Sequence, residues 1–423
     1  MRINEHLGSA IAIAGTLLCV GACIPFDAVE RGGTAAQAGE DGFGIIGSAT
    51  LPAGQMTAGE WRDLDDWDFW LGLFDVAQTL NADEFEALLA GWDMTPLERI
   101  PVQIETDGTP VVDIPVTLFD EEGKILWQAR TDNRGHAELF TDRRPIPTGD
   151  PLGELVQEGI EEASESRRYL LEIEGVDKSA TINSIPTVRK RINISASDAP
   201  QDSSLVDLML VMDTTGSMQD ELSYFQAELN DVLERVERRV DGDLELRMSV
   251  NFYRDEGDEY VVRPFPFKSP SRARSNLRDQ TAGGGGDYEE AVAQALDNAI
   301  NDHEWSPNAR ARLMLLVLDA PPHRDPRTLQ RLDKLVREAA AKGIRIIPVS
   351  GSGVLLDSEM LCRHINALTG GTYVFITNDS GIGDSHLAPT VGEYKVRPLN
   401  DLLVEIFLRY MDKRKAITEN FAL

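Results

Sequence analysis

The sequence predicts an α/β fold with a doubly wound, mostly parallel sheet, preceded by a small β-sandwich and a short helical segment. Continuous apolar runs alternate with amphipathic helices in the C-terminal half, and 207–212 is the clearest run. Such runs are typical of strands that are buried on both faces of a sheet. Short strands of alternating polarity, separated by Asp/Asn-Gly turns, occupy 98–198 and favour a sandwich there.

The composition narrows the classes of partner. The chain has 423 residues with 41 Lys+Arg and 71 Asp+Glu, which gives a net charge of −30. Nucleic acid binding needs stripes of basic residues, and so does binding to anionic lipid through a basic patch. The charge therefore argues against both classes and favours cations. The length suffices for two or three domains with cores of their own.

The first residues predict export and a lipid anchor. The apolar run Leu7–Leu18 is shorter than the ~20 residues of a spanning helix and fits the apolar region of a signal peptide at 1–22. Val20-Gly21-Ala22-Cys23 resembles the bacterial lipobox, which implies lipid attachment at Cys23. Ile24 follows rather than Asp, and the same resemblance then implies sorting to the outer membrane of the cell envelope. A plain signal peptide or an uncleaved anchor remains the alternative.

The cysteines predict no disulfide. Cys19 leaves with the signal peptide and Cys23 carries lipid, so Cys362 alone remains in the mature chain. Cys362 lies in a helix-like run, and its neighbour His364 would lie on a different face of that helix. We therefore expect a buried small apolar residue rather than a catalytic thiol.

Three further segments lead up to the α/β domain. A flexible tether is expected at 23–55 and a Trp-rich helical segment at 56–97, with tryptophans that pack on a neighbouring domain or bind a carbohydrate or partner. Within the sandwich, 111–140 resembles bacterial immunoglobulin-like and carboxypeptidase-regulatory-like modules through its turn residues Thr131, Asp132, Gly135 and Ala137. Pro151–Ser166 is expected to be a surface loop or short helix.

The α/β domain is expected at 203–412, followed by a tail at 413–423. In open α/β sheets the ligand lies at the carboxyl ends of strands, near the switch point of the strand order. Asp213 and Asp319 each end an apolar run there. Thr215 and Ser217 alternate with Asp213 along the following loop. Hard oxygen donors of this kind favour Mg²⁺, Mn²⁺ or Ca²⁺ over zinc.

These residues resemble the von Willebrand factor A domain and its metal-ion-dependent adhesion site. The resemblance rests on Asp213-x-Thr215-x-Ser217, on the glycine run 283–286 and on Leu318-Asp319-Ala320. It implies a Rossmann-like fold, a bound Mg²⁺ (or Mn²⁺/Ca²⁺) and a protein ligand that offers an acidic residue to the ion. Adhesion or complex assembly is then expected, and no enzyme activity.

The third loop of the site departs from the family. The family places a threonine there, whereas Thr281 precedes the glycines and Asp287 follows them. Both residues are candidates for completing the metal site, and the sequence does not choose between them. His323 is a further candidate, although a loop contact suits it better.

Other functions fit the same residues less well. The run after Asp213 also resembles phosphorylated aspartates of P-type ATPases and haloacid dehalogenases. The dehalogenase needs a second Asp where Thr215 stands, and no G-K-[ST] follows the glycine run to bind a nucleotide. A metal-free domain in a structural or assembly protein of the envelope is the main alternative, and a phosphoaspartate-forming hydrolase is a weaker one.

Overall fold

The computed structural model describes residues 56–142, 168–177, 179–183, 188–240, 243–378 and 387–412. All of them belong to one compact unit, Thr50–Leu423. The predicted signal peptide, lipid-attachment residue Cys23, tether, surface loop and tail lie outside the described residues.

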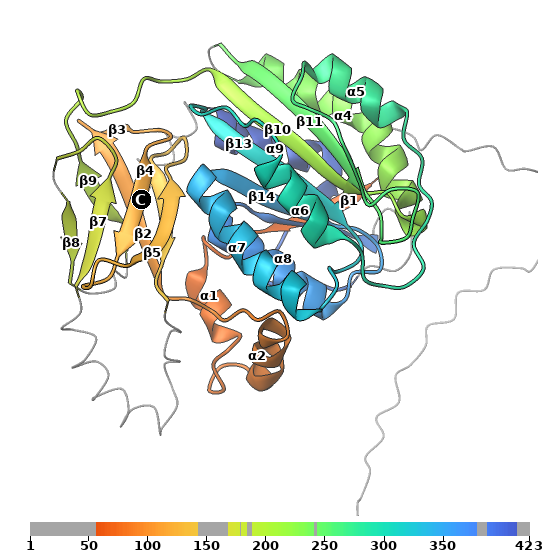
Figure 1. The fold of residues 1–423 in the computed structure, drawn as a ribbon, viewed down its shortest axis with the longest axis horizontal. Coiled ribbons are helices and arrows are strands. Elements are labelled where there is room, and N and C mark those ends of the chain that lie inside the picture. Colours follow the sequence, from red (N-terminus) through yellow and green to blue (C-terminus); the bar gives the residue numbers. More distant parts are fainter. Residues whose placement is uncertain are drawn as a thin grey trace, which may run out of the picture. The chain divides into compact units, whose positions relative to one another are not determined.

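The described part of the second half of the chain builds a mixed sheet whose core is parallel (Figure 1). The strands lie in the order β12-β11-β10-β13-β14-β15-β1-β16, in which β1 is Thr57–Trp61 and β16 is Arg397–Pro398. The central strands β11, β10, β13, β14 and β15 are parallel to one another, and β12 and β1 pair antiparallel with β11 and β15 at the two sides. Their bounds are β10 Leu205–Asp213, β11 Glu245–Tyr253, β12 Val262–Pro264, β13 Ala311–Leu318, β14 Ile344–Ser350 and β15 Tyr373–Ile376.

Helices cover both faces of this sheet, which confirms the predicted α/β fold. Because side chains alternate along a strand, Leu208 and Leu210 enter one apolar core whereas Met209 and Val211 enter the other. One core is closed by α4 Gln219–Arg239, α5 Pro270–Arg278 and α9 Leu399–Met411. The other is closed by α6 Val292–Asn301, α7 Pro326–Lys342 and α8 Leu356–Thr369.

The strand order places a switch point at β10. The chain leaves β10 for β11 on one side and later returns to β13 on the other side. The carboxyl ends of β10 and β13 therefore flank the crevice in which doubly wound sheets bind ligands. Asp213 is the last residue of β10, and Asp319 follows the last residue of β13.

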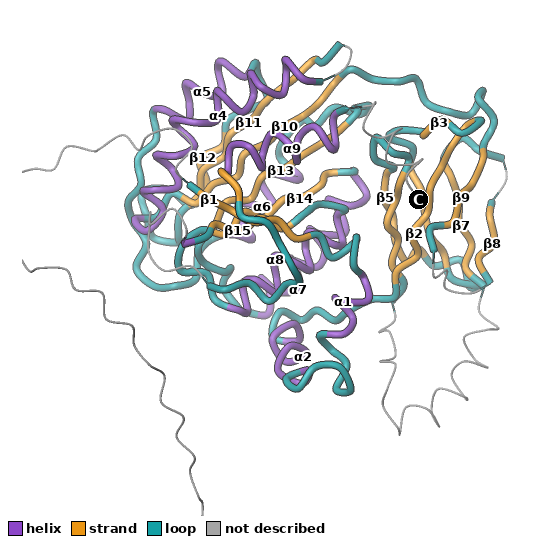
Figure 2. The backbone as a smooth tube through the Cα atoms, turned by 180° about the vertical axis from the view of Figure 1, so that it is seen from behind, coloured by secondary structure: helices purple, strands orange, loops and turns teal. Residues whose placement is uncertain are grey.

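The Trp-rich segment begins with a strand that the sequence did not predict. β1 Thr57–Trp61 lies beside β15 (Figure 2). It pairs antiparallel with β15 on one side and with β16 Arg397–Pro398 on the other. It satisfies the backbone groups that β15 would otherwise leave open at an edge. Glu60 forms an ion pair with Arg409 of α9, which fixes this strand to the C-terminal helix.

The two short helices that follow pack their aromatic side chains on α8. They are α1 Trp67–Gly72 and α2 Ala82–Ala90. Trp70 is fully buried and stacks on His364 at 6.1 Å between ring centroids. The indole N–H of Trp92 donates to the carbonyl of Asp357 at 2.9 Å. Cys362 of α8 is buried and free, as expected, and burial raises the pKa of its thiol to about 12.

The β-rich region forms two four-stranded sheets, and their strands except Thr109–Pro110 and Ala180–Ile182 lie at predicted places. Alternate side chains such as Ile100, Val102, Val116 and Leu118 are buried between them. The first sheet holds β2 Arg99–Thr106, β3 Thr109–Pro110, β6 His136–Phe140 and β9 Lys190–Asn193. The second holds β4 Pro115–Phe119, β5 Ile125–Arg130, β7 Tyr169–Ile173 and β8 Ala180–Ile182. The likeness of this β-rich region to immunoglobulin-like modules stays a prediction.

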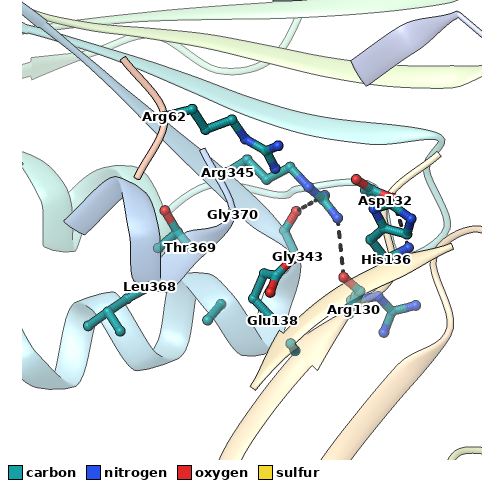
Figure 3. Close-up of a pocket in the computed structure, with 12 residues that line it drawn as sticks. Arg62, Arg130, Asp132, His136, Glu138, Gly343, Arg345, Leu368, Thr369 and Gly370 are labelled. Carbon is teal, nitrogen blue, oxygen red and sulfur yellow. Dashed lines mark hydrogen bonds between the residues drawn. The ribbon is translucent and has the colours of Figure 1, made fainter. Parts of the chain in front are cut away.

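This region contacts the main sheet at the amino ends of the sheet's strands. Arg312, near the start of β13, makes a buried ion pair with Asp113 at 2.6 Å between Nη1 and Oδ1. Arg345 of β14 donates to the carbonyls of Gly343 and Arg130 and lines a small cavity there (Figure 3). No helix of the described residues has the length and apolar character needed to cross a membrane.

Candidate metal centre

Asp213 is a fully buried acidic residue at the carboxyl edge of the sheet. Its side chain is fully buried, and its Oδ1 accepts hydrogen bonds from the backbone N–H of Thr215 at 2.8 Å and from Thr215 Oγ1 at 2.7 Å. Its Oδ2 is buried and has no hydrogen-bond partner. A buried carboxylate oxygen without a partner is costly, because water has been removed and nothing replaces it.

The loop after β10 brings two hydroxyls to this carboxylate. Thr215 has an extended backbone and precedes a short 3₁₀ turn, Gly216–Met218, which leads into α4. The turn places Ser217 Oγ 3.5 Å from Thr215 Oγ1, with Ser217 on the exposed side. The i, i+2, i+4 spacing of the motif therefore becomes a row of oxygen donors that runs from the core to the surface.

Asp319 meets the same row from the neighbouring strand. Burial raises the pKa of its carboxyl, and a hydrogen bond from the Ser217 hydroxyl partly offsets that rise. Asp319 Oδ1 is buried and has no hydrogen-bond partner. The structure thus brings together Asp213, Thr215, Ser217 and Asp319, as the sequence predicts, because β10 and β13 are adjacent and parallel.

The raised pKa values of Asp213 and Asp319 show that this group lacks a compensating positive charge. Burial raises the pKa of Asp213 to about 8, and the nearby charge of Asp319 adds to that rise. No salt bridge in the described residues reaches either carboxyl. With no basic side chain beside them, the carboxyls must keep a proton or receive a cation.

The structure does not place the predicted third-loop residues with this group. Thr281 is exposed, and its carbonyl accepts a hydrogen bond from Arg254 Nη2 at 2.8 Å. Asp287 is exposed as well, and no hydrogen bond described for the chain joins its side chain to the buried carboxyls. Neither residue therefore shares a described hydrogen bond with the group, so the geometry gives no support to the expectation that one of them completes it, and that expectation stays a prediction.

The glycine run explains this departure. Gly283 N–H donates to the carbonyl of Thr214 at 3.0 Å, and Gly216 N–H donates to the carbonyl of Gly284 at 3.3 Å. Gly284 and Gly285 have φ values of +83° and +78°, which side chains other than glycine rarely adopt. The third loop therefore approaches the metal-site loop with bare backbone, and Thr281 and Asp287 lie on either side of the contact.

Glu290 is the acidic residue of the third loop that the sequence analysis missed. Its side chain is buried, and Oε2 has no hydrogen-bond partner. Burial and the charge of Asp213 together raise its pKa to about 9. Its backbone N–H donates to the carbonyl of Pro321 at 2.9 Å, which fixes the loop to the one that carries Asp319. Its only signal in the sequence is an acidic residue that directly precedes an apolar helical run.

Glu221, on the first turn of α4, is a second acidic residue that the sequence analysis missed. Its Oε1 accepts hydrogen bonds from the backbone N–H of Ser352 at 3.2 Å and from the Ser352 hydroxyl at 3.1 Å, whereas Oε2 has no partner. Burial raises its pKa, and the charge of Asp319 contributes. Four carboxyl groups with an unpartnered buried oxygen therefore act on one another at this edge.

His323 serves a neighbouring carboxylate instead of this group. Its Nε2 lies 2.7 Å from Asp255 Oδ1. Burial lowers the pKa of His323, but the bond to Asp255 outweighs it and the net shift is upward. Because its ring nitrogen already contacts Asp255, His323 fits the loop contact that the sequence favoured.

The donor set suits one hard cation held by mixed oxygen ligands. No group of three or more His, Cys, Asp or Glu side chains among the described residues has an arrangement that holds a metal ion by itself. The hydroxyls of Thr215 and Ser217, together with water, would have to complete the coordination of an ion between Asp213 and Asp319. Mg²⁺ accepts such sites, since it usually keeps several waters and takes one or two carboxylates.

Comparison with known families agrees with this geometry. Residues 207–381 match the model of the von Willebrand factor type A domain, so the chain contains such a domain. The match covers the strands, helices and loops that build the carboxylate group. Domains of this family often bind a divalent metal and commonly mediate protein interactions. No curated protein matches the chain.

Proposed function

We propose that this protein is a binding module of the bacterial cell envelope that holds a divalent cation and, through it, an acidic group of a protein ligand. Mg²⁺ is the ion that the donors fit best, with Mn²⁺ or Ca²⁺ as alternatives. The observation that carries the proposal is the pair of buried, unpartnered oxygens Asp213 Oδ2 and Asp319 Oδ1 beside the hydroxyls of Thr215 and Ser217.

The chain's own residues explain why such an ion would bind a ligand. When it is bound, the ion supplies positive charge and an open coordination position. Thr215 and Ser217 are neutral donors, so they do not cancel that charge. Asp213 is fully buried, whereas Ser217 is exposed, which orients the open side of the group toward solvent. A carboxylate of a partner is the hard anionic oxygen ligand that fits there.

The envelope location rests on the sequence of the first residues. The apolar run Leu7–Leu18 and the lipobox-like Val20–Cys23 support export and lipid attachment at Cys23. Multiple acyl chains would anchor the protein stably, because each buried CH₂ contributes about 0.8 kcal/mol. Outer-membrane sorting, which Ile24 suggests, belongs to the same proposal. Labelling with a radioactive fatty acid in wild type and Cys23→Ala tests the lipid attachment, and equal labelling of the two proteins would refute attachment at Cys23.

Isothermal titration calorimetry with Mg²⁺ tests the metal site. The wild-type protein, freed of metal by a chelator, should bind one ion, and Asp213→Ala should show no metal-dependent heat. Asp287→Ala is the matched control, because it removes a carboxylate from the same edge but outside the buried group, and it should bind Mg²⁺ like wild type. No metal-dependent heat in the folded wild-type protein would refute the proposal.

A further inference from the structure

We propose that a groove between α4 and α5 binds an acidic helical segment of a partner protein without a metal ion. This groove, called the α4–α5 groove, is lined by Asn230 and Glu234 of α4 on one side and by Arg274 and Arg278 of α5 on the other. The inference goes beyond the proposed function, because the buried carboxyls at the carboxyl edge of the sheet take no part in it.

The α4–α5 groove is a polar hollow on a helix-covered face of the main sheet. α4 and α5 lie side by side there (Figure 1). The groove has a volume of about 480 Å³. Phe225, Leu229 and Leu277 form its floor and are each at most 2% exposed. Since the floor presents little apolar surface, a ligand must be held mainly by the polar side chains above it.

The two sides of the α4–α5 groove are fixed before a ligand arrives. Gln226 of α4 donates through Nε2 to the carbonyls of Leu277 and Gln280, each at 3.0 Å. These carbonyls lie at the carboxyl end of α5, where a helix leaves its own carbonyls without partners. The bonds therefore tie α5 to α4, and a groove that is already formed lowers the cost of ordering on binding.

The α5 helix is a basic segment of an acidic protein. Residues 268–278 contain four basic side chains and no acidic one, whereas the whole chain has 41 Lys+Arg against 71 Asp+Glu. The side chains of Arg274 and Arg278 form no ion pair and no hydrogen bond with the residues that the structure describes. Arg247 of β11, by contrast, pairs with Asp207. The groove thus holds two positive charges that remain available to an anionic partner.

The acidic residue of the groove is already neutralised within α4. Glu234 is the one acid among the described residues that line the groove. Its Oε1 accepts from Asn230 Nδ2 at 2.8 Å, and its Oε2 lies 3.8 Å from Arg238 Nη1. Glu234 therefore opposes an incoming carboxylate only weakly.

Asn230 indicates that the anionic partner is a polypeptide. Its Oδ1 is buried and has no hydrogen-bond partner, so it can accept an N–H from a ligand. A polypeptide carries an N–H donor at every residue except proline, whereas a phosphate group that has lost its protons carries none. A segment of a protein therefore satisfies both the arginines and this acceptor.

The spacing of the two arginines predicts the spacing of the acids. Arg274 and Arg278 are four residues apart on one helix, so they lie about 6 Å apart along its axis on the same face. A guanidinium binds a carboxylate through two parallel hydrogen bonds. A partner helix with Asp or Glu three or four residues apart presents two carboxylates at the matching distance, and grooves between helices accept such segments.

The net charge of the chain disfavours the other anionic partners. A membrane surface or a nucleic acid is an extended polyanion, and the net charge of −30 would repel it. A second copy of the chain carries the same charge. A short acidic segment meets mainly the local arginines, because more distant charges are screened beyond about 8 Å at physiological salt.

A phage-displayed library of helical peptides, selected on the full chain in the presence of chelator, tests the inference. Peptides of about 15 residues are long enough to form a helix. We expect enrichment of Asp or Glu pairs that are three or four residues apart. In fluorescence anisotropy, Arg274→Gln/Arg278→Gln should bind the selected peptides about tenfold more weakly, which corresponds to about 1.4 kcal/mol.

Matched variants separate the groove from the general charge of α5. Arg272 is exposed on the same helix but does not line the groove, so Arg272→Gln should keep peptide affinity within a factor of about two. Arg274→Glu/Arg278→Glu should reject the acidic peptides and bind versions in which Lys replaces the acids. Urea denaturation of each variant checks that the chain remains folded, and addition of Mg²⁺ should leave peptide affinity unchanged.

The possible results distinguish this inference from the proposed function. No enrichment of acidic pairs, or equal affinity in wild type and Arg274→Gln/Arg278→Gln, overturns the inference and leaves the metal site untouched. Binding to phosphatidylglycerol vesicles that the same variant loses would make a lipid surface the occupant and overturn it. A dimer that persists in chelator and is lost in this variant, seen by analytical ultracentrifugation, would make a second copy the occupant and also overturn it.

Discussion

The two ends of the main sheet bury charge in opposite ways. At the amino ends of the strands each buried acid has a basic partner: Asp113 pairs with Arg312 at 2.6 Å, and Asp207 pairs with Arg247 at 2.8 Å. At the carboxyl ends, Asp213 and Asp319 are equally buried but have no basic partner among the described residues. Since the depth of burial is similar, the difference in pairing separates structural charges from charges that await a ligand.

The pKa values follow the same division. Hydrogen bonds and charges from Arg312 and Arg130 outweigh burial at Asp113 and lower its pKa. At Asp213 burial dominates and the pKa rises to about 8. Uncompensated carboxyls at a functional edge are the pattern expected of a cation site, because an ion can supply the charge that the protein omits.

The largest effect should come from breaking a pair at the amino ends. Arg312→Met leaves Asp113 buried with one arginine fewer, and we expect a loss of about 3–5 kcal/mol in the free energy of unfolding. Urea denaturation at pH 7 measures it. The matched change at the other edge, Asp213→Asn, should not destabilise the metal-free protein. If Asp213→Asn in the presence of chelator lowers the free energy of unfolding as much as Arg312→Met does, the two edges of the sheet do not differ in how they compensate buried charge.

The second largest effect should be the stabilisation of the folded protein by Mg²⁺. At a free Mg²⁺ concentration about 100-fold above its Kd, the wild-type protein should gain about 2.7 kcal/mol in the free energy of unfolding. Asp319→Asn should gain almost nothing, since the ion loses one of its two carboxylates. Urea denaturation with Mg²⁺ and with chelator measures the gain. An equal gain in Asp319→Asn would place the ion elsewhere.

The third effect, slightly smaller than the gain from Mg²⁺, is a loss of stability of the metal-free protein as pH rises. A carboxyl with a raised pKa in the folded state holds a proton that the same carboxyl has lost in the unfolded state. For Asp213 the free energy of unfolding therefore falls as pH rises from about 4 to about 8. Between about pH 6.5 and 8, one such carboxyl lowers the free energy of unfolding by about 2 kcal/mol. Urea denaturation with chelator at both pH values should show this fall in wild type and a shallower one in Asp213→Asn. Equal slopes would remove Asp213 as the source.

The smallest expected effect tests how much the third loop contributes to Mg²⁺ affinity. Glu290→Gln removes a buried carboxyl that can give up its proton when a cation binds beside it, and we expect Mg²⁺ to bind about tenfold more weakly, or about 1.4 kcal/mol. Thr281→Ala and Asp287→Asn are exposed changes in the same loop and should leave the Kd within a factor of about two. Calorimetry on the three variants measures this. A larger loss in Thr281→Ala than in Glu290→Gln would restore the family's threonine position.

Local sequence sufficed to predict much of the fold. Most strands of the main sheet and of the two four-stranded sheets lie where runs of apolar or alternating residues predict them, because burial of one or both faces acts along each strand separately. The short strands Thr109–Pro110, Ala180–Ile182 and Arg397–Pro398 were not predicted. The strand β1 escaped prediction, since Trp61 belongs to an amphipathic pattern as well as to a strand. Only the open edge of β15, more than 300 residues away, makes the extended form the better one.

The amino acid sequence by itself determined the core of the candidate site, because Asp213, Thr215 and Ser217 lie on one short stretch of chain and Asp319 directly follows another predictable strand of the same sheet. The tertiary structure decided which acid of the third loop accompanies them. Glu290 became buried and Thr281 and Asp287 did not, because the glycine backbone packs on Thr214 and Gly216. Burial and pairing depend on contacts between distant segments, and a local pattern of residues does not contain them.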